Sequence, residues 1–176
     1  TTTGSASLVD MTNAGMPLPN PADTAARRPV GRIVFHPTDA NTAWVAFGGY
    51  GVTSGHHVWK TTNFAGGAAT WVPSGSGIPD VPVNALAVDP VRPADIYAGT
   101  DIGVFLSRDG GATWTPHSDS LPRVAVFDLS FQEGSFPRVL RAATHGRGIW
   151  ERPAASSEML IDSSVSSSSS SDTISK

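Results

Sequence analysis

One carboxylate in the sequence has a setting that is suited to chemistry. Asp101 directly follows Tyr97-Ala-Gly-Thr100, at an expected loop between two strands, where a side chain can reach a ligand. Cleavage of a glycosidic bond needs two carboxyl groups that face one cleft, and no partner acid for Asp101 is evident. Because Asp-Ile-Gly is also common in turns, we interpret Asp101 first as a turn residue, with catalysis as its alternative role.

Three further residues have loop settings that suit ligand binding. Tyr50 lies in Gly48–Gly55, an insertion that departs from the repeat described below, and functional loops commonly depart from scaffold positions. His145 and Arg147 alternate with glycines in Thr144–Gly148, where the backbone can approach a ligand and a guanidinium can bind an anion. The competing interpretation of Thr144–Gly148 is a glycine-rich turn between two strands.

Metal and thiol chemistry find no support in the sequence. The chain has no cysteine, so it has neither a thiolate nucleophile nor a zinc-thiolate site. His56 and His57 are adjacent, and neighbouring residues on a strand point to opposite faces, so the two rings cannot bind one metal ion together. We therefore expect no metal and no other cofactor.

The composition of the chain excludes several partner classes and indicates a fold class. A net charge of -3 with no Lys/Arg-rich run gives no basic surface for nucleic acid. No apolar run approaches the ~20 residues that span a bilayer, so we expect no membrane insertion. With 18 Gly, 14 Pro and a charged fraction of only 15%, the 176-residue chain favours short strands and many turns, which is typical of an all-β protein.

Three copies of one strand-rich unit follow one another along the chain. Each matched piece is rich in Val, Ile, Phe, Trp and Tyr and is bounded by Pro, Gly, Asn or Asp, which is typical of strands joined by tight turns. The match runs without a gap from Val30–Ala46 to Val83–Gly99. The third copy, with strands at Val126–Phe131, Val139–Ala142 and Gly148–Trp150, lacks a fourth strand. Four-stranded repeats of ~40–50 residues predict antiparallel β-propeller blades.

The repeats divide the chain into five segments. We assign residues 30–79 to blade one, 80–122 to blade two and 123–153 to an incomplete blade three. Residues 154–176 form a Ser-rich linker or tail, which cannot bury enough apolar surface to order itself. Residues 1–29 hold an outer strand of a preceding or closing blade, and a connector.

The outer strand is expected at Ser5–Pro17, because Leu8–Pro17 matches Thr113–Pro122 position for position. Closed propellers typically use ~4–8 blades. About three blades therefore need either the remainder of a larger propeller or a second copy of the chain. We expect the remainder of a larger propeller, because the sequence starts in the middle of the repeat pattern, with an outer strand that lacks its own blade.

The segment Ser107-Arg-Asp-Gly-Gly-Ala-Thr-Trp114 spaces its residues as a hairpin turn requires. The aspartate can accept hydrogen bonds from the turn that follows, the two glycines can adopt a positive φ, and the tryptophan can fill the gap between blades. We therefore assign this set to structure rather than to catalysis: Ser107, Asp109, Gly111, Thr113 and Trp114.

This segment is a full S-x-D-x-G-x-T-W match and resembles the Asp box, or BNR repeat, of sialidases, xyloglucanases and sortilin-type receptor propellers. Ala87–Pro90, Ile96–Thr100 and Thr144–Glu151 are phrases typical of the same families. The first copy carries a degenerate box in Thr61, Asn63 and Thr70-Trp71. The resemblance implies the C-terminal portion of an Asp-box β-propeller that is secreted or at the cell surface.

The resemblance leaves two kinds of function open. A sialidase needs three arginines that clamp a carboxylate and a Tyr/Glu pair, and this cluster cannot be assembled from the sequence. We therefore predict a binding or scaffold module for protein or glycan, not catalytic as an isolated chain. The alternative is the C-terminal part of a xyloglucanase-like or sialidase-like glycoside hydrolase whose other catalytic residues lie outside this chain.

The repeat alignment also makes a prediction about packing. Trp59, Phe105 and Trp150 occupy one equivalent position in the three copies, which is what a packing requirement produces. We expect all three side chains to be buried between blades.

Overall fold

The computed structural model of the protein describes residues 28–51, 53, 55–66, 69–132, 134 and 138–154. No helix within these ranges is long and apolar enough to cross a membrane. The elements of the described part are, in order, β1 (Val30–Phe35), β2 (Ala43–Phe47), β3 (Val58–Thr61), the 3-10 turn η2 (Phe64–Gly66), β4 (Val72–Pro73), β5 (Val83–Val88), β6 (Ile96–Thr100), β7 (Gly103–Ser107), β8 (Thr115–Pro116), β9 (Val126–Phe131), β10 (Val139–Thr144) and β11 (Ile149–Pro153).

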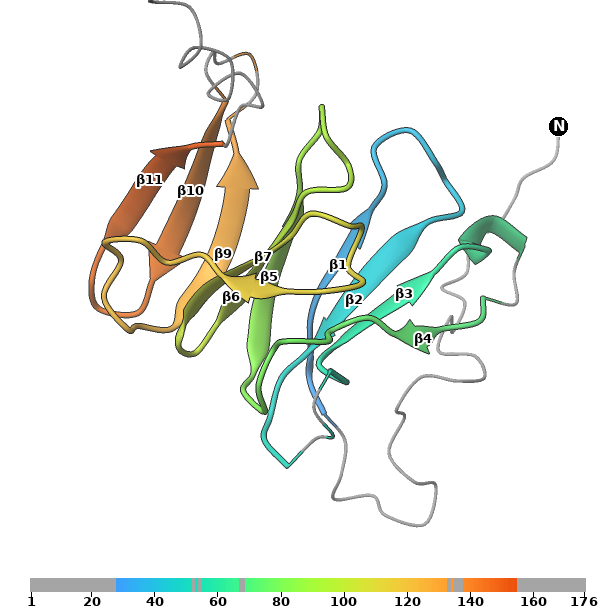
Figure 1. The fold of residues 1–176 in the computed structure, drawn as a ribbon, viewed down its shortest axis with the longest axis horizontal. Helices are drawn as coiled ribbons and strands as arrows, with labels where there is room; N and C mark the ends of the chain where they lie inside the picture. Colours follow the sequence, from blue (N-terminus) through green and yellow to red (C-terminus); the bar gives the residue numbers. More distant parts are fainter. Residues whose placement is uncertain are drawn as a thin grey trace, which may run out of the picture.

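The strands form antiparallel sheets whose order follows the chain. β1–β4 and β5–β8 each make a four-stranded sheet, and β9–β11 make a three-stranded sheet. Figure 1 shows the sheets following one another across the view, from β4 on the right to β11 on the left. The predicted all-β fold built from propeller blades is therefore confirmed. We call the three sheets blade one, blade two and blade three.

Most of the described core lies between neighbouring blades, and a further apolar cluster lies on blade one alone. β6 and β7 of blade two are buried along their whole length, because blade one covers one face and blade three covers the other. An apolar cluster at the first interface includes Trp44, Leu86 and Phe105, and one at the second includes Tyr97, Leu129 and Leu140. Since burial of apolar surface is the main favourable term in folding, each blade depends on its neighbours.

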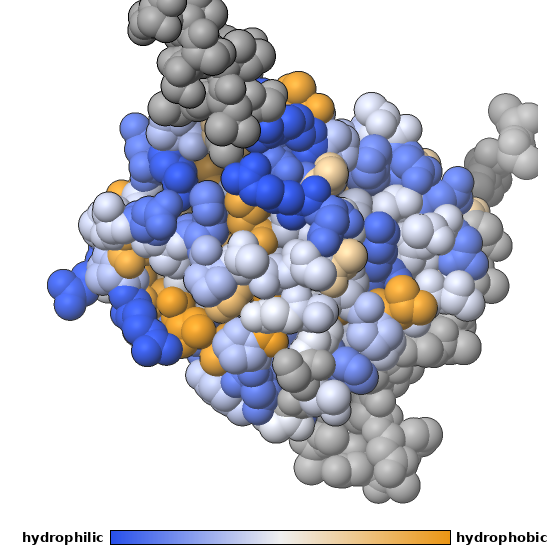
Figure 2. All heavy atoms as spheres, viewed as in Figure 1, coloured by the Kyte–Doolittle hydropathy of each residue, from blue (hydrophilic) through white to orange (hydrophobic). Residues whose placement is uncertain are grey.

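The outcome for the three equivalent aromatics is mixed. Phe105 is 5% exposed and packs in the cluster between blades one and two, so its predicted burial between blades is confirmed. Trp59 is 6% exposed, but the described residues that surround it all belong to blade one, so it is buried without lying between two described blades. Trp150 is 37% exposed, so the prediction for the third copy is wrong. β8 pairs with β7 beside Phe105, whereas β11 of Trp150 is the edge of its sheet in the described part of the chain. Figure 2 shows hydrophobic atoms interspersed with hydrophilic ones at the surface over blade three.

Two expectations fall on segments that the structure does not describe. The expected outer strand Ser5–Pro17 and the Ser-rich stretch from residue 155 onward lie outside the described residues. Both remain predictions from the sequence.

Candidate functional site

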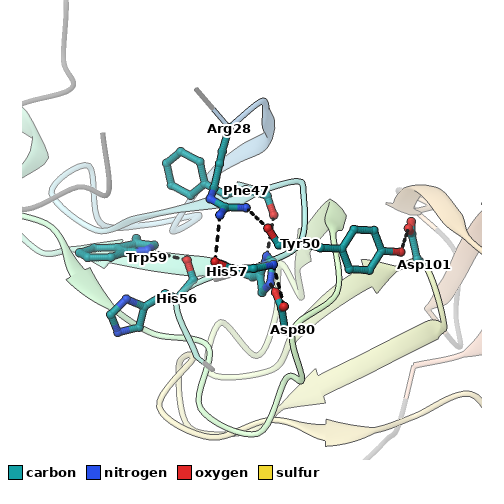
Figure 3. Close-up of polar contacts among 9 residues, drawn as sticks. Arg28, Phe47, Tyr50, His56, His57, Trp59, Asp80 and Asp101 are labelled. Atoms are coloured by element: carbon teal, nitrogen blue, oxygen red, sulfur yellow. Dashed lines mark hydrogen bonds and ion pairs between the residues drawn. The ribbon is translucent and has the colours of Figure 1, made fainter. Parts of the chain in front are cut away.

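Tyr50 and Asp101, two of the residues singled out from the sequence, lie in contact at one end of the first blade interface. The Tyr50 hydroxyl donates a hydrogen bond of 2.8 Å to Asp101 Oδ2 (Figure 3). The amide of Asn84 donates to the other carboxylate oxygen at 2.9 Å. Tyr50 comes from blade one and Asp101 and Asn84 come from blade two, so the cluster links two blades.

The repeat explains why these residues meet. Gly48 and Asp101 each follow the second strand of a blade, and each donates its backbone N–H to a carbonyl just before the first strand: Gly48 to Pro29 at 2.9 Å and Asp101 to Pro82 at 3.3 Å. The two turns therefore lie at the same end of adjacent blades. The β2–β3 turn is lengthened by its insertion, and this extra length lets Tyr50 contact the next blade.

The insertion is held from both sides by charged groups. Arg28 donates to the carbonyls of Tyr50 and Gly51 at 2.6 and 3.0 Å. The N–H of Gly51 donates to Asp80 Oδ2 at 2.7 Å. Asp80 Oδ1 lies 3.0 Å from Nε2 of the buried His57. Figure 3 shows these contacts beside the tyrosine, from Arg28 above it in the view to Asp80 below it. These contacts fix the backbone that carries Tyr50.

The environment of Tyr50 disfavours ionisation of its hydroxyl. The hydrogen bond to Asp101 raises the pKa of Tyr50 above its usual 10.0, and the nearby negative charges of Asp101 and Asp80 act in the same direction. The side chain is nevertheless 61% exposed. The arrangement offers a ligand an accessible aromatic face, a neutral hydroxyl and a carboxylate that accepts hydrogen bonds.

His145 and Arg147 lie on the turn of blade three and do not join this cluster through any hydrogen bond in the described ranges. His145 is the counterpart of Asp101, since its N–H donates to Ala125 O at 2.9 Å. Its exposed ring packs edge-on against Phe127, with centroids 5.4 Å apart. The carbonyl of Arg147 accepts the indole N–H of Trp150 at 2.8 Å. The structure thus shows a glycine-rich turn here, with both side chains exposed.

The 107–114 turn lies at the opposite end of β7 from Asp101, because β7 separates the two turns. Asp109 accepts hydrogen bonds from the N–H and hydroxyl of Thr113 at 2.9 and 2.6 Å and from the Ser107 hydroxyl at 2.7 Å. Burial acts to raise the pKa of Asp109, but these hydrogen bonds outweigh it and lower the pKa to about 2. The carboxylate is therefore bound within its own turn and faces away from the Tyr50 cluster.

Blade one builds the same turn with different residues. Asn63 Oδ1 accepts from the Thr61 hydroxyl at 2.8 Å and from the Thr70 N–H at 2.9 Å. These bonds match those of Asp109 with Ser107 and Thr113. In blade one the amide oxygen of Asn63 therefore accepts the hydrogen bonds that the carboxylate of Asp109 accepts in blade two. Because an uncharged side chain can replace the aspartate in this way, the position has a structural role.

Sequence reasoning missed part of the cluster. The side chains that support the insertion are those of Arg28, His57 and Asp80. They were not singled out from the sequence, because only the insertion itself differs from the other copies of the repeat. The one usable signal was the position of Asp80 just after Ile78-Pro79, at the connection between blades. No group of three or more potential metal ligands occurs among the described residues.

Comparisons with known proteins identify the fold. No protein-family model matches this sequence, and no curated protein matches it. Among solved structures, an ancestral GH74 enzyme matches with 23% identity and a TM-score of 0.52 over 65% of this chain and 13% of that chain. The GH74 enzyme from Niastella koreensis matches with 20% identity and a TM-score of 0.50 over 70% of this chain and 21% of that chain.

A third match comes from a protein of another kind. A chain described as the extracellular domain of a hybrid two component system from B. thetaiotaomicron matches with 14% identity and a TM-score of 0.51, over 77% of this chain and 17% of that chain. At these identities the matches show the fold alone. The present chain spans 13% to 21% of the length of these three structures.

Proposed function

We propose that this protein is a glycan-binding propeller module whose ligand site is the Tyr50–Asp101 cluster. The observation that carries the proposal is the 2.8 Å hydrogen bond between the Tyr50 hydroxyl and Asp101 across two blades. It places an exposed aromatic ring beside a carboxylate that is already oriented.

The chemistry of the cluster fits a sugar. An exposed aromatic face stacks on the apolar face of a pyranose ring, and an oriented carboxylate accepts hydrogen bonds from ring hydroxyls. Asp101 is oriented by Tyr50 and Asn84, so little side-chain freedom is lost on binding, which favours affinity. The guanidinium of Arg28 is occupied by the carbonyls of Tyr50 and Gly51. A neutral glycan therefore fits better than an acidic one.

The location of the protein follows as a further part of the proposal. Two matched structures are GH74 enzymes and one is an extracellular domain. The 107–114 turn has the residue pattern of an Asp box. Together with the Ser-rich end of the sequence, these features support a secreted or cell-surface module.

Binding is tested by titrating the chain with neutral oligosaccharides, namely cello-oligosaccharides and xyloglucan oligosaccharides, with sialyllactose as the acidic comparison. We expect the neutral sugars to bind and Tyr50→Ala to weaken their binding about tenfold, which is the low end of the ~1–3 kcal/mol that stacking on an aromatic side chain is worth for a nucleobase. Val91→Ala is the control, because Val91 is 65% exposed and outside the cluster. Equal affinity of the wild type and Tyr50→Ala would refute the site.

A second candidate function is that of a fragment of a glycoside hydrolase. The specific observation is that a second acid, Asp80, belongs to the same cluster, since Gly51 binds Asp80 while its neighbour Tyr50 binds Asp101. Glycoside hydrolysis uses two carboxyl groups. Turnover of β-glucans or sialosides by the isolated chain that disappears in Asp101→Asn would establish this alternative. We expect no turnover.

A further inference from the structure

Blade three has an unpaired strand edge in the described part of the chain. In blade two, β7 pairs with the outer strand β8. β11 holds the place of β7 in blade three, and among the described residues it pairs with β10 alone. Trp150 on β11 is 37% exposed, whereas Phe105 at the same place on β7 is 5% exposed. The edge of β11 therefore offers backbone groups and an aromatic side chain to a further strand.

A hollow lies beside this edge, between blades two and three. Its volume of about 60 Å³ is several times the ~10–15 Å³ that one water molecule needs. Residues 117–119, in the segment that follows β8, form part of its wall. Its apolar lining comes from both blades and consists of Val104, Leu121, Leu140, Ala142 and Trp150. The hollow can thus accept an apolar side chain.

At the first blade interface the equivalent place is filled by Trp114. This residue is 3% exposed and immediately precedes the outer strand β8. Its indole donates to the carbonyl of Ser74, in the segment that follows β4. It packs in one apolar cluster with a set that matches the lining of the hollow, one blade earlier in the chain: Val58, Ile78, Ile96, Ala98 and Phe105. The hollow is thus the place of a residue that precedes an outer strand of blade three.

Backbone bonds and strand pairings support this match between the two interfaces. The N–H of Ser74 donates to Val58 O at 2.8 Å after β4, and the N–H of His117 donates to Val104 O at 2.8 Å after β8. The pairing of β10 with β11 likewise repeats that of β6 with β7, with an alanine opposite the aromatic residue in both blades. The segments that frame Trp114 and those that frame the hollow therefore correspond residue by residue.

The sequence after β11 supplies a residue for this place. Residues 103–107 of β7 correspond to residues 148–152. Continued without a gap, this correspondence carries Trp114 to Met159 and the two residues of β8 to Leu160 and Ile161. These three form the only run of consecutive apolar residues in 155–176. Because side chains alternate along a strand, Met159 and Ile161 share one face.

We propose that residues 159–161 are the outer strand of blade three, paired with β11, and that the Met159 side chain fills the hollow between blades two and three. In this register Leu160 lies opposite Glu151 and Ile161 lies opposite Trp150, as in the pairing of β8 with β7. A methionine suits the place, because its flexible side chain adapts to irregular gaps. Blade three then has four strands, and the Ser-rich tail starts at residue 162 rather than at 154.

The expected strand Ser5–Pro17 competes for the same edge, since Val9 also matches Trp114. Continuity favours the segment after β11, because in all three sheets each strand pairs with its neighbours in the chain. The connection from β11 to Leu160 also has the length of the connection from β7 to β8. A further blade of a longer propeller does not compete, because blades pack face to face and pair only their own strands.

Disulfide formation within the full chain tests the pairing. The protein has no cysteine, so Glu151→Cys with Leu160→Cys carries two thiols. Directly opposite residues lie ~4.5–5.5 Å apart at Cβ, which is close to disulfide geometry. Glu151→Cys with Val165→Cys is the matched control, because the cost of closing a flexible loop rises only slowly with its length. We expect the first pair to oxidise at least about tenfold faster under native conditions, and both pairs to oxidise at similar rates in urea.

A third pair tests the competing strand. Asp10 matches the first residue of β8 in the Ser5–Pro17 alignment, so Glu151→Cys with Asp10→Cys reports on that strand at the edge of β11. We expect this pair to oxidise more slowly than Glu151→Cys with Leu160→Cys under native conditions.

Urea denaturation tests the side chain in the hollow. We expect Met159→Asp to lower the urea midpoint by roughly 0.5–1 M, because a charge enters an apolar site. Met159→Leu should keep the midpoint of the wild type, because leucine has a similar volume. Val165→Asp is the control, since it places the same charge in the tail, and its midpoint should also stay unchanged.

Three results would overturn the proposal. Equal native oxidation rates for the Leu160 and Val165 pairs would show that the segment after β11 is not paired with it. Faster oxidation of the Asp10 pair than of the Leu160 pair would give the edge to Ser5–Pro17. Equal urea midpoints for Met159→Asp and Val165→Asp would show that Met159 does not occupy the hollow.

Discussion

Trp114 of blade two donates its indole N–H to the backbone carbonyl of Ser74 in blade one, at 2.6 Å. The Ser74 hydroxyl in turn donates to the carbonyl of Gly111 at 2.8 Å, and the N–H of Trp114 donates to Ser76 O at 2.8 Å. The 107–114 turn of blade two is thus joined to the segment that follows β4 of blade one by three hydrogen bonds. Two of them are donated by Trp114 and one is donated by Ser74. This contact fixes how the two blades sit against each other.

Replacement of Trp114 should therefore be costly. The side chain is 3% exposed, and Trp114→Ala should lower the free energy of unfolding by about 3–5 kcal/mol, as large-to-small aromatic substitutions in cores do. Urea denaturation followed by circular dichroism measures the change. Trp150→Ala is the control, since that indole is 37% exposed, and we expect a clearly smaller loss. If both variants lost the same free energy of unfolding, the burial of Trp114 between blades one and two would be contradicted.

The sequence predicted this contact because it repeats. Trp71 and Trp114 follow the same turn pattern, and a residue conserved between copies of a repeat serves the packing of every copy. Trp150 shows where that reasoning fails. Its position repeats, but its surroundings do not, because burial depends on the neighbouring strand as well as on the residue.

The Tyr50 cluster could be predicted only in part. The insertion singled out Tyr50 as a ligand-binding candidate, and the turn after β6 singled out Asp101. Nothing in the sequence predicted that the two side chains are in contact. Their hydrogen bond depends on the path of a loop that has no counterpart in the other blades. Arg28 and Asp80 hold the loop in that path. An arginine and an aspartate at these positions do not by themselves predict that they bind the loop.

Protonation of Asp109 should weaken the protein at low pH. Its pKa in the folded state is about 2, below the ~3.9 of an unfolded aspartate. Its contribution to stability is therefore complete above about pH 4 and is lost as the pH falls from about 4 to about 2. Denaturation midpoints measured across this window should fall less steeply in Asp109→Asn than in the wild type.

Asn is a suitable substitution at this position, because Asn63 makes the same hydrogen bonds in blade one. Asp119→Asn is the control, since the Asp119 side chain is 80% exposed and forms an ion pair at the surface. We expect the pH dependence of the Asp119→Asn variant to follow that of the wild type. Identical profiles for the wild type and Asp109→Asn would show that the turn contributes no pH-dependent stability.

The contact between Tyr50 and Asp101 should be visible in an ultraviolet titration of tyrosine. The pKa of Tyr50 is raised chiefly by its hydrogen bond to Asp101, so Asp101→Asn should let Tyr50 ionise at a lower pH than in the wild type. The only other tyrosine is Tyr97, and subtraction of the Tyr50→Phe curve isolates the signal of Tyr50. An unchanged midpoint in Asp101→Asn would place the hydroxyl away from the carboxylate in solution.

Gly111 should tolerate no side chain, for two separate reasons. Its φ is +92°, a conformation that costs a residue with a Cβ roughly 1–2 kcal/mol. A Cβ would also lie 2.6 Å from Ser74 Oγ and 2.9 Å from Trp44 Nε1, inside contact distance at the blade interface. Gly146 separates the two effects, because its φ is +75° and a Cβ there would meet no atom within 4 Å.

We therefore expect Gly146→Ala to lower the free energy of unfolding by roughly 1–2 kcal/mol, the backbone cost alone. Gly111→Ala should lower it by that amount plus a steric cost of about 1–3 kcal/mol, as overpacking of a core does. Urea denaturation of both variants measures the difference. Equal losses would mean that the interface yields to the added methyl group, and that the turn of blade two is not held tightly against Ser74 and Trp44.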